Sequence, residues 1–108
     1  MKNKLKNTID VYYEAFMSNK PELLTNVLTE EVYLRDWEIE KHGIEEVIET
    51  SSQIMKLPNF DIDILNEIYE GEFAVVDIIV KVNEETLKVI DLFEFENYKI
   101  KSIKAYKG

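Results

Sequence analysis

The sequence contains no cysteine, and its 108 residues include only three glycines, two prolines and one histidine. Without cysteine, the chain has neither disulfide bonds nor thiolate chemistry. No glycine-rich phosphate loop and no Ser–His–Asp or Cys–His arrangement is recognisable, which argues against nucleotide cofactors and covalent acyl chemistry. No apolar run approaches the roughly 20 residues that span a bilayer. No linker or repeat divides the chain, so we predict one domain over residues 1–108.

Positive charge is also scarce, because 13 Lys and Arg residues stand against 22 Asp and Glu residues, for a net charge of −9. That field repels nucleic acid and anionic membranes, so neither is expected as a partner. The basic first six residues are not followed by an apolar segment and do not form a signal peptide. We therefore expect a cytoplasmic protein.

The first half of the chain carries apolar residues at helical spacing. A first helix is predicted to end near Ser18–Pro21, and a second, short helix to begin at Pro21 and end at residues 29–31. A strand over 32–36 and a polar connection over 37–42 follow, before a third helix over 44–56. The residues expected to face the core are Leu5, Ile9, Tyr12, Tyr13, Phe16, Leu23, Leu24, Val27, Leu28, Ile44, Val47, Ile48, Ser51 and Met55.

The second half alternates between apolar and polar residues and predicts strands over 60–69, 73–82, 86–96 and 100–106. Helices followed by a strand meander indicate an α+β fold with a mainly antiparallel sheet. A strongly curved sheet with helices on one face forms a cone with an open mouth. The other face keeps apolar side chains, which predicts a homodimer through the outer sheet face. These side chains are Leu65, Tyr69, Phe73, Val75, Ile79, Ile90 and Leu92.

One carboxyl group, that of Asp91, stands on an otherwise apolar face of the strand over 86–96. Its neighbours on that face are Leu87, Val89, Phe93 and Phe95. Burial there raises the pKa of a carboxyl group, which lets it donate a hydrogen bond near neutral pH. Such perturbed carboxyls often mark functional sites. The alternative is a structural Asp91 that bonds to the backbone or to a helix end.

Two further residues are candidates for chemistry. Asp36 shares a strand face with Val32 and Leu34 and ends that strand, where a carboxylate is placed to act as a general base. Its alternative role is a cap or an ion pair with Arg35. Tyr12 lies on the apolar stripe of the first helix, and its hydroxyl needs a partner, either Asp91 or a ligand oxygen. The alternative is a core tyrosine.

Other polar and aromatic residues receive simpler interpretations. Tyr13 is assigned to packing or to an interface, and His42 to a surface loop. Trp37 is expected at the mouth of the cone, either lining it or covering the edge of the core. No acidic or histidine spacing matches a metal site, so neither metal nor cofactor is expected.

Three segments in order carry a resemblance to a known superfamily. Residues 12–32 contain Tyr-x-x-x-Phe, Glu-Leu-Leu and Leu-Thr-Glu-Glu-Val, and Leu-Arg-Asp at 34–36 precedes His-Gly-Ile at 42–44. The third segment is Val-Ile-Asp-Leu-Phe-Glu-Phe at 89–95, followed by residues 99–106. In this order the chain resembles the SnoaL-like branch of the NTF2-like superfamily. The resemblance implies a cystatin-like, NTF2-like cone.

Ketosteroid isomerase-like members of that superfamily use an Asp base, with a Tyr and a protonated Asp that hold the oxyanion. The resemblance implies that Asp36 is the base and that Tyr12 and Asp91 are the oxyanion donors. Trp37-Glu38 replaces the proline-containing turn of that branch, and the chain is shorter than the isomerases. A polar pocket is thus implied more strongly than isomerisation is.

Two hypotheses follow from the sequence. The first is a cofactor-free isomerase, cyclase or dehydratase that acts on a small apolar carbonyl compound. Trp37, Met55 and Phe93 are then predicted to contact that compound. The second is a non-catalytic module that binds a small ligand or dimerises, with a cone that holds a ligand or is filled by its own side chains. A purely structural subunit is a third class.

Overall fold

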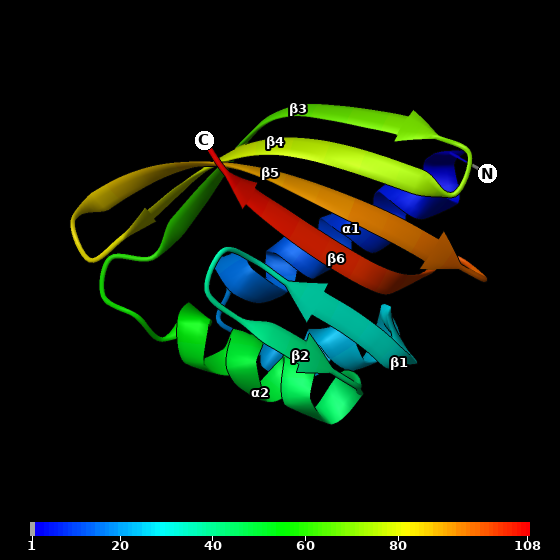
Figure 1. The fold of residues 1–108 in the computed structure, drawn as a ribbon, viewed down its shortest axis with the longest axis horizontal. Coiled ribbons are helices and arrows are strands. Elements are labelled where there is room, and N and C mark those ends of the chain that lie inside the picture. The colour runs from blue at the N-terminus through cyan, green and yellow to red at the C-terminus, as the bar shows by residue number, and fades with distance from the viewer. Residues whose placement is uncertain (1) are drawn as a thin grey trace.

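The computed structural model describes residues 2–108, in which helices cover one face of a curved sheet (Figure 1). The helices are α1 (Lys2–Met17), the 3₁₀ helix η1 (Pro21–Asn26) and α2 (Ile44–Met55). The strands are β1 (Leu28–Arg35), β2 (Glu40–His42), β3 (Asp61–Glu70), β4 (Phe73–Val82), β5 (Glu85–Glu96) and β6 (Lys99–Lys107). Their order in the sheet is β2-β1-β6-β5-β4-β3, and only β1 and β6 pair in parallel. The predicted α+β fold with a mainly antiparallel sheet is confirmed.

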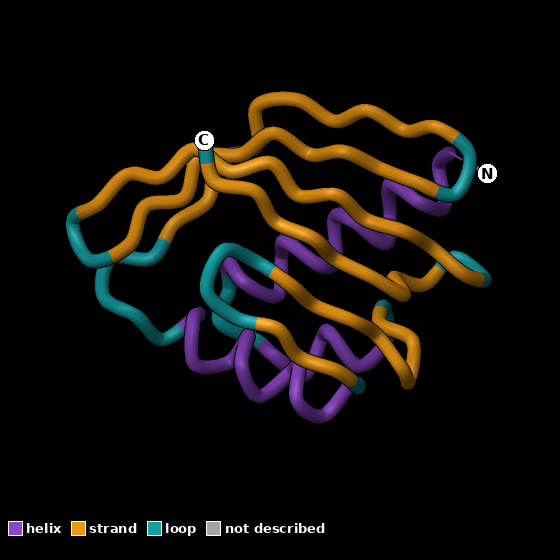
Figure 2. The backbone as a smooth tube through the Cα atoms, viewed as in Figure 1, coloured by secondary structure: helices purple, strands orange, loops and turns teal. Residues whose placement is uncertain are grey.

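The sheet bends far enough to reach the helices again. The tube view shows β3, β4 and β5 curving around toward the end of α2 (Figure 2). At the β4–β5 turn, the N–H of Asn83 donates to the carbonyl oxygen of Pro58, which follows α2, at 2.9 Å. This contact closes one side of the cone and leaves an enclosed space between α2 and the concave face of the sheet.

The predicted apolar stripe of α1 is buried against that concave face. Leu5, Ile9, Tyr12, Tyr13 and Phe16 are each 8% exposed or less. On α2, the helical period likewise buries Val47, Ser51 and Met55, as predicted. The two helices therefore present defined side chains to the interior of the cone.

The sequence prediction was wrong about two short segments. The second helix ends at Asn26, before Leu28, because Leu28 already pairs with Ile100 as the start of β1. Residues 40–42, predicted as part of a polar connection, form β2 on the open edge of β1. A three-residue polar edge strand has too little alternation to be visible in a sequence.

The prediction for β3 was wrong beyond its midpoint. A bulge between Ile64 and Asn66 shifts the register of the strand against β4. An extra residue in one strand reverses which side chains face the core after it. Ile68, predicted to face inward, is therefore 62% exposed, and Tyr69, predicted to face outward, packs against the core.

Replacing Glu84 by glycine is expected to raise the free energy of unfolding by about 1 kcal/mol. Asn83 and Glu84 form the β4–β5 turn with φ values of 52° and 72°, a left-handed conformation that costs a residue with a Cβ atom. Urea denaturation of the two proteins measures the difference. Glu85→Gly is the matched control: it lies at the start of β5 and should lower stability. A loss of stability in Glu84→Gly would contradict the turn assignment.

Candidate active site

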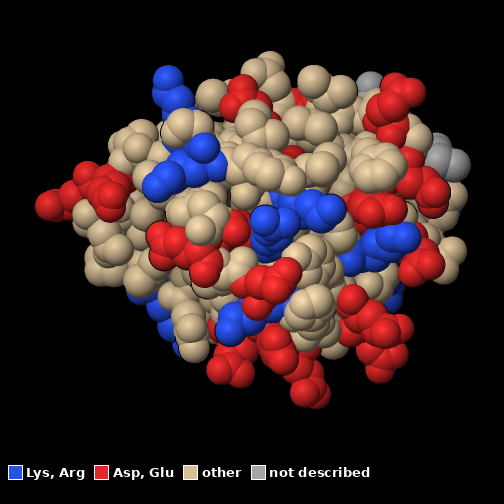
Figure 3. Space-filling view, in the orientation of Figure 1, with Lys and Arg blue, Asp and Glu red and all other residues tan. Residues whose placement is uncertain are grey.

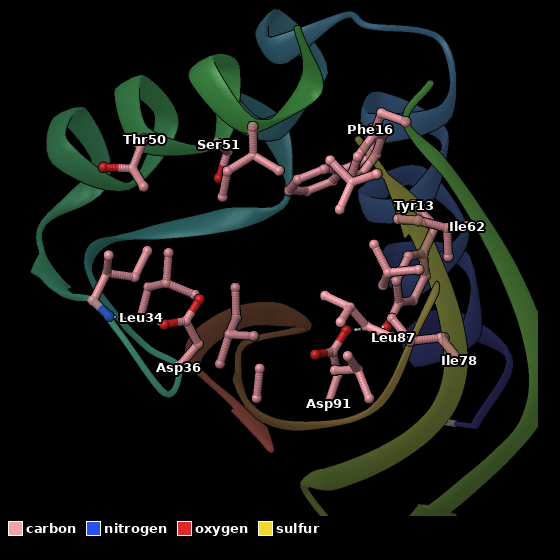
Figure 4. Close-up of a pocket in the computed structure, with 18 of the residues that line it drawn as sticks. Tyr13, Phe16, Leu34, Asp36, Thr50, Ser51, Ile62, Ile78, Leu87 and Asp91 are labelled. Atoms are coloured by element: carbon pink, nitrogen blue, oxygen red, sulfur yellow. Dashed lines mark hydrogen bonds between the residues drawn. The ribbon is translucent and has the colours of Figure 1, made fainter. Parts of the chain in front are cut away.

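A cavity of about 380 Å³ lies between the concave face of the sheet, α1, α2 and the loop after β1. Aliphatic side chains from β3 to β6 make most of its wall, among them Ile62, Ile78, Val80, Leu87, Val89 and Ile103. The polar groups come from α1, α2, the loop after β1 and, for Asp91, from β5, and they line the same space (Figure 4). A largely apolar wall with a few converging polar groups is typical of small-molecule sites.

Asp91 enters this cavity from the middle of β5. Its side of the strand is the core face, as its alternation with Val89 and Phe93 predicted, and the residue is only 6% exposed. Burial raises the pKa of the carboxyl group from 3.8 to about 6, and the charge of Asp36 adds to that rise. A hydrogen bond from Tyr13 opposes it. Asp91 therefore changes charge near neutral pH, which suits a proton-transfer group.

Tyr13, and not Tyr12, is the tyrosine that forms a hydrogen bond with Asp91. The Tyr13 hydroxyl donates to Asp91 Oδ2 at 2.6 Å, joining α1 to β5 inside the core. Burial, and then the charge of Asp91, raises the pKa of Tyr13 well above 10.0, so the phenol remains a donor. Tyr13 packs in the core, one of the two roles expected for it, but its hydrogen bond to Asp91 was not predicted. The other Asp91 oxygen points into the cavity (Figure 4).

Tyr12 is the tyrosine whose hydroxyl remains available. Its ring packs edge-on against Phe93, with 5.2 Å between the ring centroids, and the residue is 6% exposed. It lines the cavity, and within residues 2–108 its hydroxyl has no hydrogen-bond partner. Burial raises its pKa well above 10.0, so a ligand oxygen would meet a donor. Its predicted role as an oxyanion donor stays a prediction.

Asp36 follows the end of β1 and lines the cavity at its mouth. Its Oδ1 accepts the backbone N–H groups of Glu38 and Ile39, at 2.7 and 2.8 Å. The side chain thus caps the loop, one of the alternatives weighed for it, and it has no ion pair with Arg35 among the described residues. Oδ2 has no such partner, so the carboxylate keeps one oxygen free for chemistry.

Of the three residues predicted to contact a ligand, Trp37 alone lines the cavity. Trp37 lines the mouth and is 40% exposed. Met55 and Phe93 are buried in the core at 5% and 0% exposure and do not line the cavity, so their prediction as contact residues was wrong. One turn before Met55, Thr50 and Ser51 line it instead (Figure 4). The helical period identified Ser51 as buried but could not show that it borders a cavity.

Other candidates lie elsewhere. His42 is exposed on β2, where its ring lies 4.9 Å from that of Tyr33. Across residues 2–108, no group of three or more His, Cys, Asp or Glu side chains is arranged to hold a metal ion. None of the helices in this range is long and apolar enough to cross a membrane.

Known proteins share this architecture. The family model of the SnoaL-like domain matches residues 9–103. An NTF2-like protein of unknown function from Mesorhizobium loti superposes with a TM-score of 0.91, at 13% identity, over 98% of this chain and 92% of that one. A proposed ketosteroid isomerase from Kribbella flavida gives 0.86 at 12% identity, over 98% of this chain and 78% of that one.

A proposed polyketide cyclase from Sinorhizobium meliloti gives a TM-score of 0.85 at 14% identity, over 92% of this chain and 93% of that one. At these identities the likeness establishes the fold alone. Among curated proteins, none matches the chain.

Proposed function

Because this chain belongs to the SnoaL-like domain family, within the NTF2-like superfamily, we propose that it is a cofactor-free enzyme that moves a proton on a small, largely apolar carbonyl compound. Isomerisation, aldol-type cyclisation and dehydration all begin with such a step. The observation that supports this most is the pair of carboxyl groups, Asp36 and Asp91, on one apolar cavity with Tyr12. Carboxyl groups in different environments can serve as base and acid in the same site.

In this proposal, Asp36 Oδ2 takes a proton from the carbon next to the carbonyl group. The backbone N–H groups on Oδ1 hold the carboxylate in place. Tyr12 and protonated Asp91 donate to the oxyanion that forms, and each such donor typically lowers the barrier by about 3–4 kcal/mol. A substrate that displaces water from the cavity favours the protonated form of Asp91 further. Tyr13 orients Asp91 through the bond to Oδ2.

Hydrogen exchange tests this function, because all three reactions share the first proton transfer. Small ketones such as cyclohexanone and cyclohex-3-enone are incubated with the protein in D₂O, and loss of the α-hydrogen signal is followed by NMR. We expect exchange well above the buffer rate, with conversion of cyclohex-3-enone to its conjugated isomer. Exchange at the buffer rate for every ketone would contradict the proposal.

The second candidate is a non-catalytic binding or dimeric module. Two observations favour it: Asp36 already caps a loop, and the outer sheet face is apolar without a covering layer. In Figure 3, uncharged side chains cover much of the area over β3, β4 and β5. Phe73 is 45% exposed and Ile90 38%, while Ile68 and Leu92 lie in the rows between them.

We propose that this face binds a second copy of the chain. The charges at its ends are largely balanced, since Asp61 pairs with Lys81, Asp63 lies in the row of Lys88, and Glu94 forms an ion pair with Lys101. A twofold axis across the strands brings the same face of both copies together, which makes the contact self-complementary. The same axis buries the apolar rows between them.

Ile90→Asp should convert this dimer into a monomer, because it places a second carboxylate beside Asp77, its cross-strand neighbour, in the middle of the buried face. Light scattering at micromolar concentration measures the mass of each protein. Leu57→Asp is the control, because Leu57 is 40% exposed just after α2, away from the sheet, and should leave the dimer intact. A monomeric mass for the unmodified chain would refute the dimer.

A further inference from the structure

The polar side of the cavity is acidic. Asp36, Glu38 and Asp91 line it, whereas its lining includes no Lys, Arg or His within the part of the chain that the structure describes. Asp91 is buried among apolar side chains and Asp36 is half-buried, so water screens these two carboxyl groups less than at an open surface, whereas Glu38 is exposed. A carboxylate or phosphate inside this space would meet like charges and no basic side chain of the lining, since Lys107 lies outside it, over the Trp37 ring.

Two residues of low exposure present hydroxyl groups to the cavity. Tyr12 is 6% exposed and Ser51 is 1% exposed, and both line the cavity. Neither hydroxyl bonds to another residue of the described range 2–108, and that of Ser51 points into the open space in Figure 4. No fully buried side-chain oxygen in the described residues lacks a hydrogen bond, so these two hydroxyls are accessible from the cavity, where a ligand atom can bond to them.

The mouth of the cavity has a surface that attracts cations. The ammonium group of Lys107 lies 5.4 Å from the centroid of the Trp37 ring, within the distance of a cation–π interaction. Lys107 is itself exposed and does not line the cavity. The ring, Glu38 and the free Asp36 Oδ2 therefore border a position where a second cation would be stabilised by charge and by the aromatic face.

We propose that the ligand of this cavity is a cation: a protonated amine on a small apolar body, without a carboxylate or phosphate. Its ammonium group lies at the mouth, beside the carboxylate of Glu38 and the ring of Trp37, where the charge of Asp36 attracts it while Asp36 Oδ2 remains directed at the reacting carbon. The apolar body fills the aliphatic cone, and a polar atom at its far end accepts hydrogen bonds from Tyr12 and Ser51. This inference rests on the proposed function, because it gives the charge of the same site's substrate.

Three probes of one size test the charge preference: cyclohexylmethylamine, cyclohexylmethanol and cyclohexanecarboxylate. Trp37 is the single tryptophan of the sequence, so its fluorescence reports binding at the mouth. At neutral pH, we expect the amine to bind at least tenfold more tightly than the alcohol. The carboxylate should not bind at concentrations that saturate the amine. Equal affinity for amine and alcohol, tighter binding of the carboxylate, or no saturable binding of any probe would overturn the proposal.

Variants separate this site from the general negative charge of the protein. Asp36→Asn and Glu38→Gln should each reduce the amine-to-alcohol ratio toward one. Glu30→Gln removes the same charge from an exposed position on β1 outside the cavity and should leave the ratio unchanged. An equal reduction in all three variants would mean that net charge alone selects the amine, which also overturns the proposal.

The ketone exchange assay distinguishes this failure from failure of the proposed function. Selective amine binding without ketone exchange leaves a cation-binding module. Ketone exchange without amine preference leaves the enzyme and removes the cationic substrate. The proposed enzyme function and the cationic substrate are therefore tested by different measurements.

Discussion

Replacing Asp36 by asparagine should lower the rate of ketone hydrogen exchange by roughly 10²–10⁴-fold, the usual contribution of a positioned general base. Asparagine keeps an Oδ1 atom that accepts the N–H groups of Glu38 and Ile39, so the loop retains its cap. The substituted amide has no basic oxygen at the position of Oδ2. The expected change is therefore in chemistry and not in fold.

The measurement compares exchange rates at saturating ketone with circular dichroism and urea denaturation of the same samples. Asp63→Asn is the control, since Asp63 is exposed on β3 and does not line the cavity, and its rate should match that of the unmodified chain. A folded Asp36→Asn protein with an unchanged rate would remove Asp36 from the mechanism and favour the binding module.

Asp91 should make the protein less stable as pH rises. The pKa of its carboxyl group is about 6 in the fold against 3.8 unperturbed, so the unfolded chain gives up the proton first as pH increases. Stability contributed by protonated Asp91 is present in full at low pH and falls mainly between about pH 4 and 6. The shift corresponds to about 3 kcal/mol in total, because one pKa unit is worth about 1.4 kcal/mol.

Asp91→Asn isolates this loss from the titration of other carboxyl groups. The variant cannot ionise at this position, and its amide oxygen can still accept from Tyr13. Urea denaturation should therefore show its stability rising relative to the unmodified chain by about 3 kcal/mol from acid to neutral pH. A pH-independent difference would show that Asp91 titrates like a solvated carboxyl group.

The pH dependence of the NMR shift of the Asp91 carboxyl carbon gives the pKa of this group directly. Tyr13→Phe should raise the pKa of Asp91 above about 6, because the Tyr13 hydrogen bond lowers it. Tyr33→Phe is a control, since the Tyr33 hydroxyl bonds to exposed Glu40 and does not contact the cavity.

Much of the fold was predictable because the apolar patterns of its helices and strands extend over many residues. The stripe on α1 and the alternation in β4 and β5 each repeat several times, so single exceptions do not hide them. The β3 bulge has no comparable signal. Ile64, Leu65 and Ile68 place apolar residues on both faces of that strand, so the sequence is compatible with either register.

In the candidate site, too, features that depend on one strand or helix were predictable, and features that depend on how these elements pack together were not. Asp91 was found because its face of β5 is otherwise apolar. Tyr12 and Tyr13 are adjacent on one helical stripe, and both are buried. Which of them reaches Asp91 depends on how α1 is rotated against the sheet, and a helical period carries no information on that rotation. The same limit applies to Met55 and Phe93, which were correctly placed inside but not at the cavity wall.

The position of β6 has a consequence for how the protein is made. This strand is the last element along the chain, yet it lies between β1 and β5 in the sheet. Until residues 99–107 leave the ribosome, β1 can pair only with β2, and the meander of β3 to β5 exposes the edge of β5 in addition to that of β3. Folding during synthesis should therefore stall before the cone closes, and a nascent chain paused just short of β6 should be captured by chaperones that bind exposed strand edges.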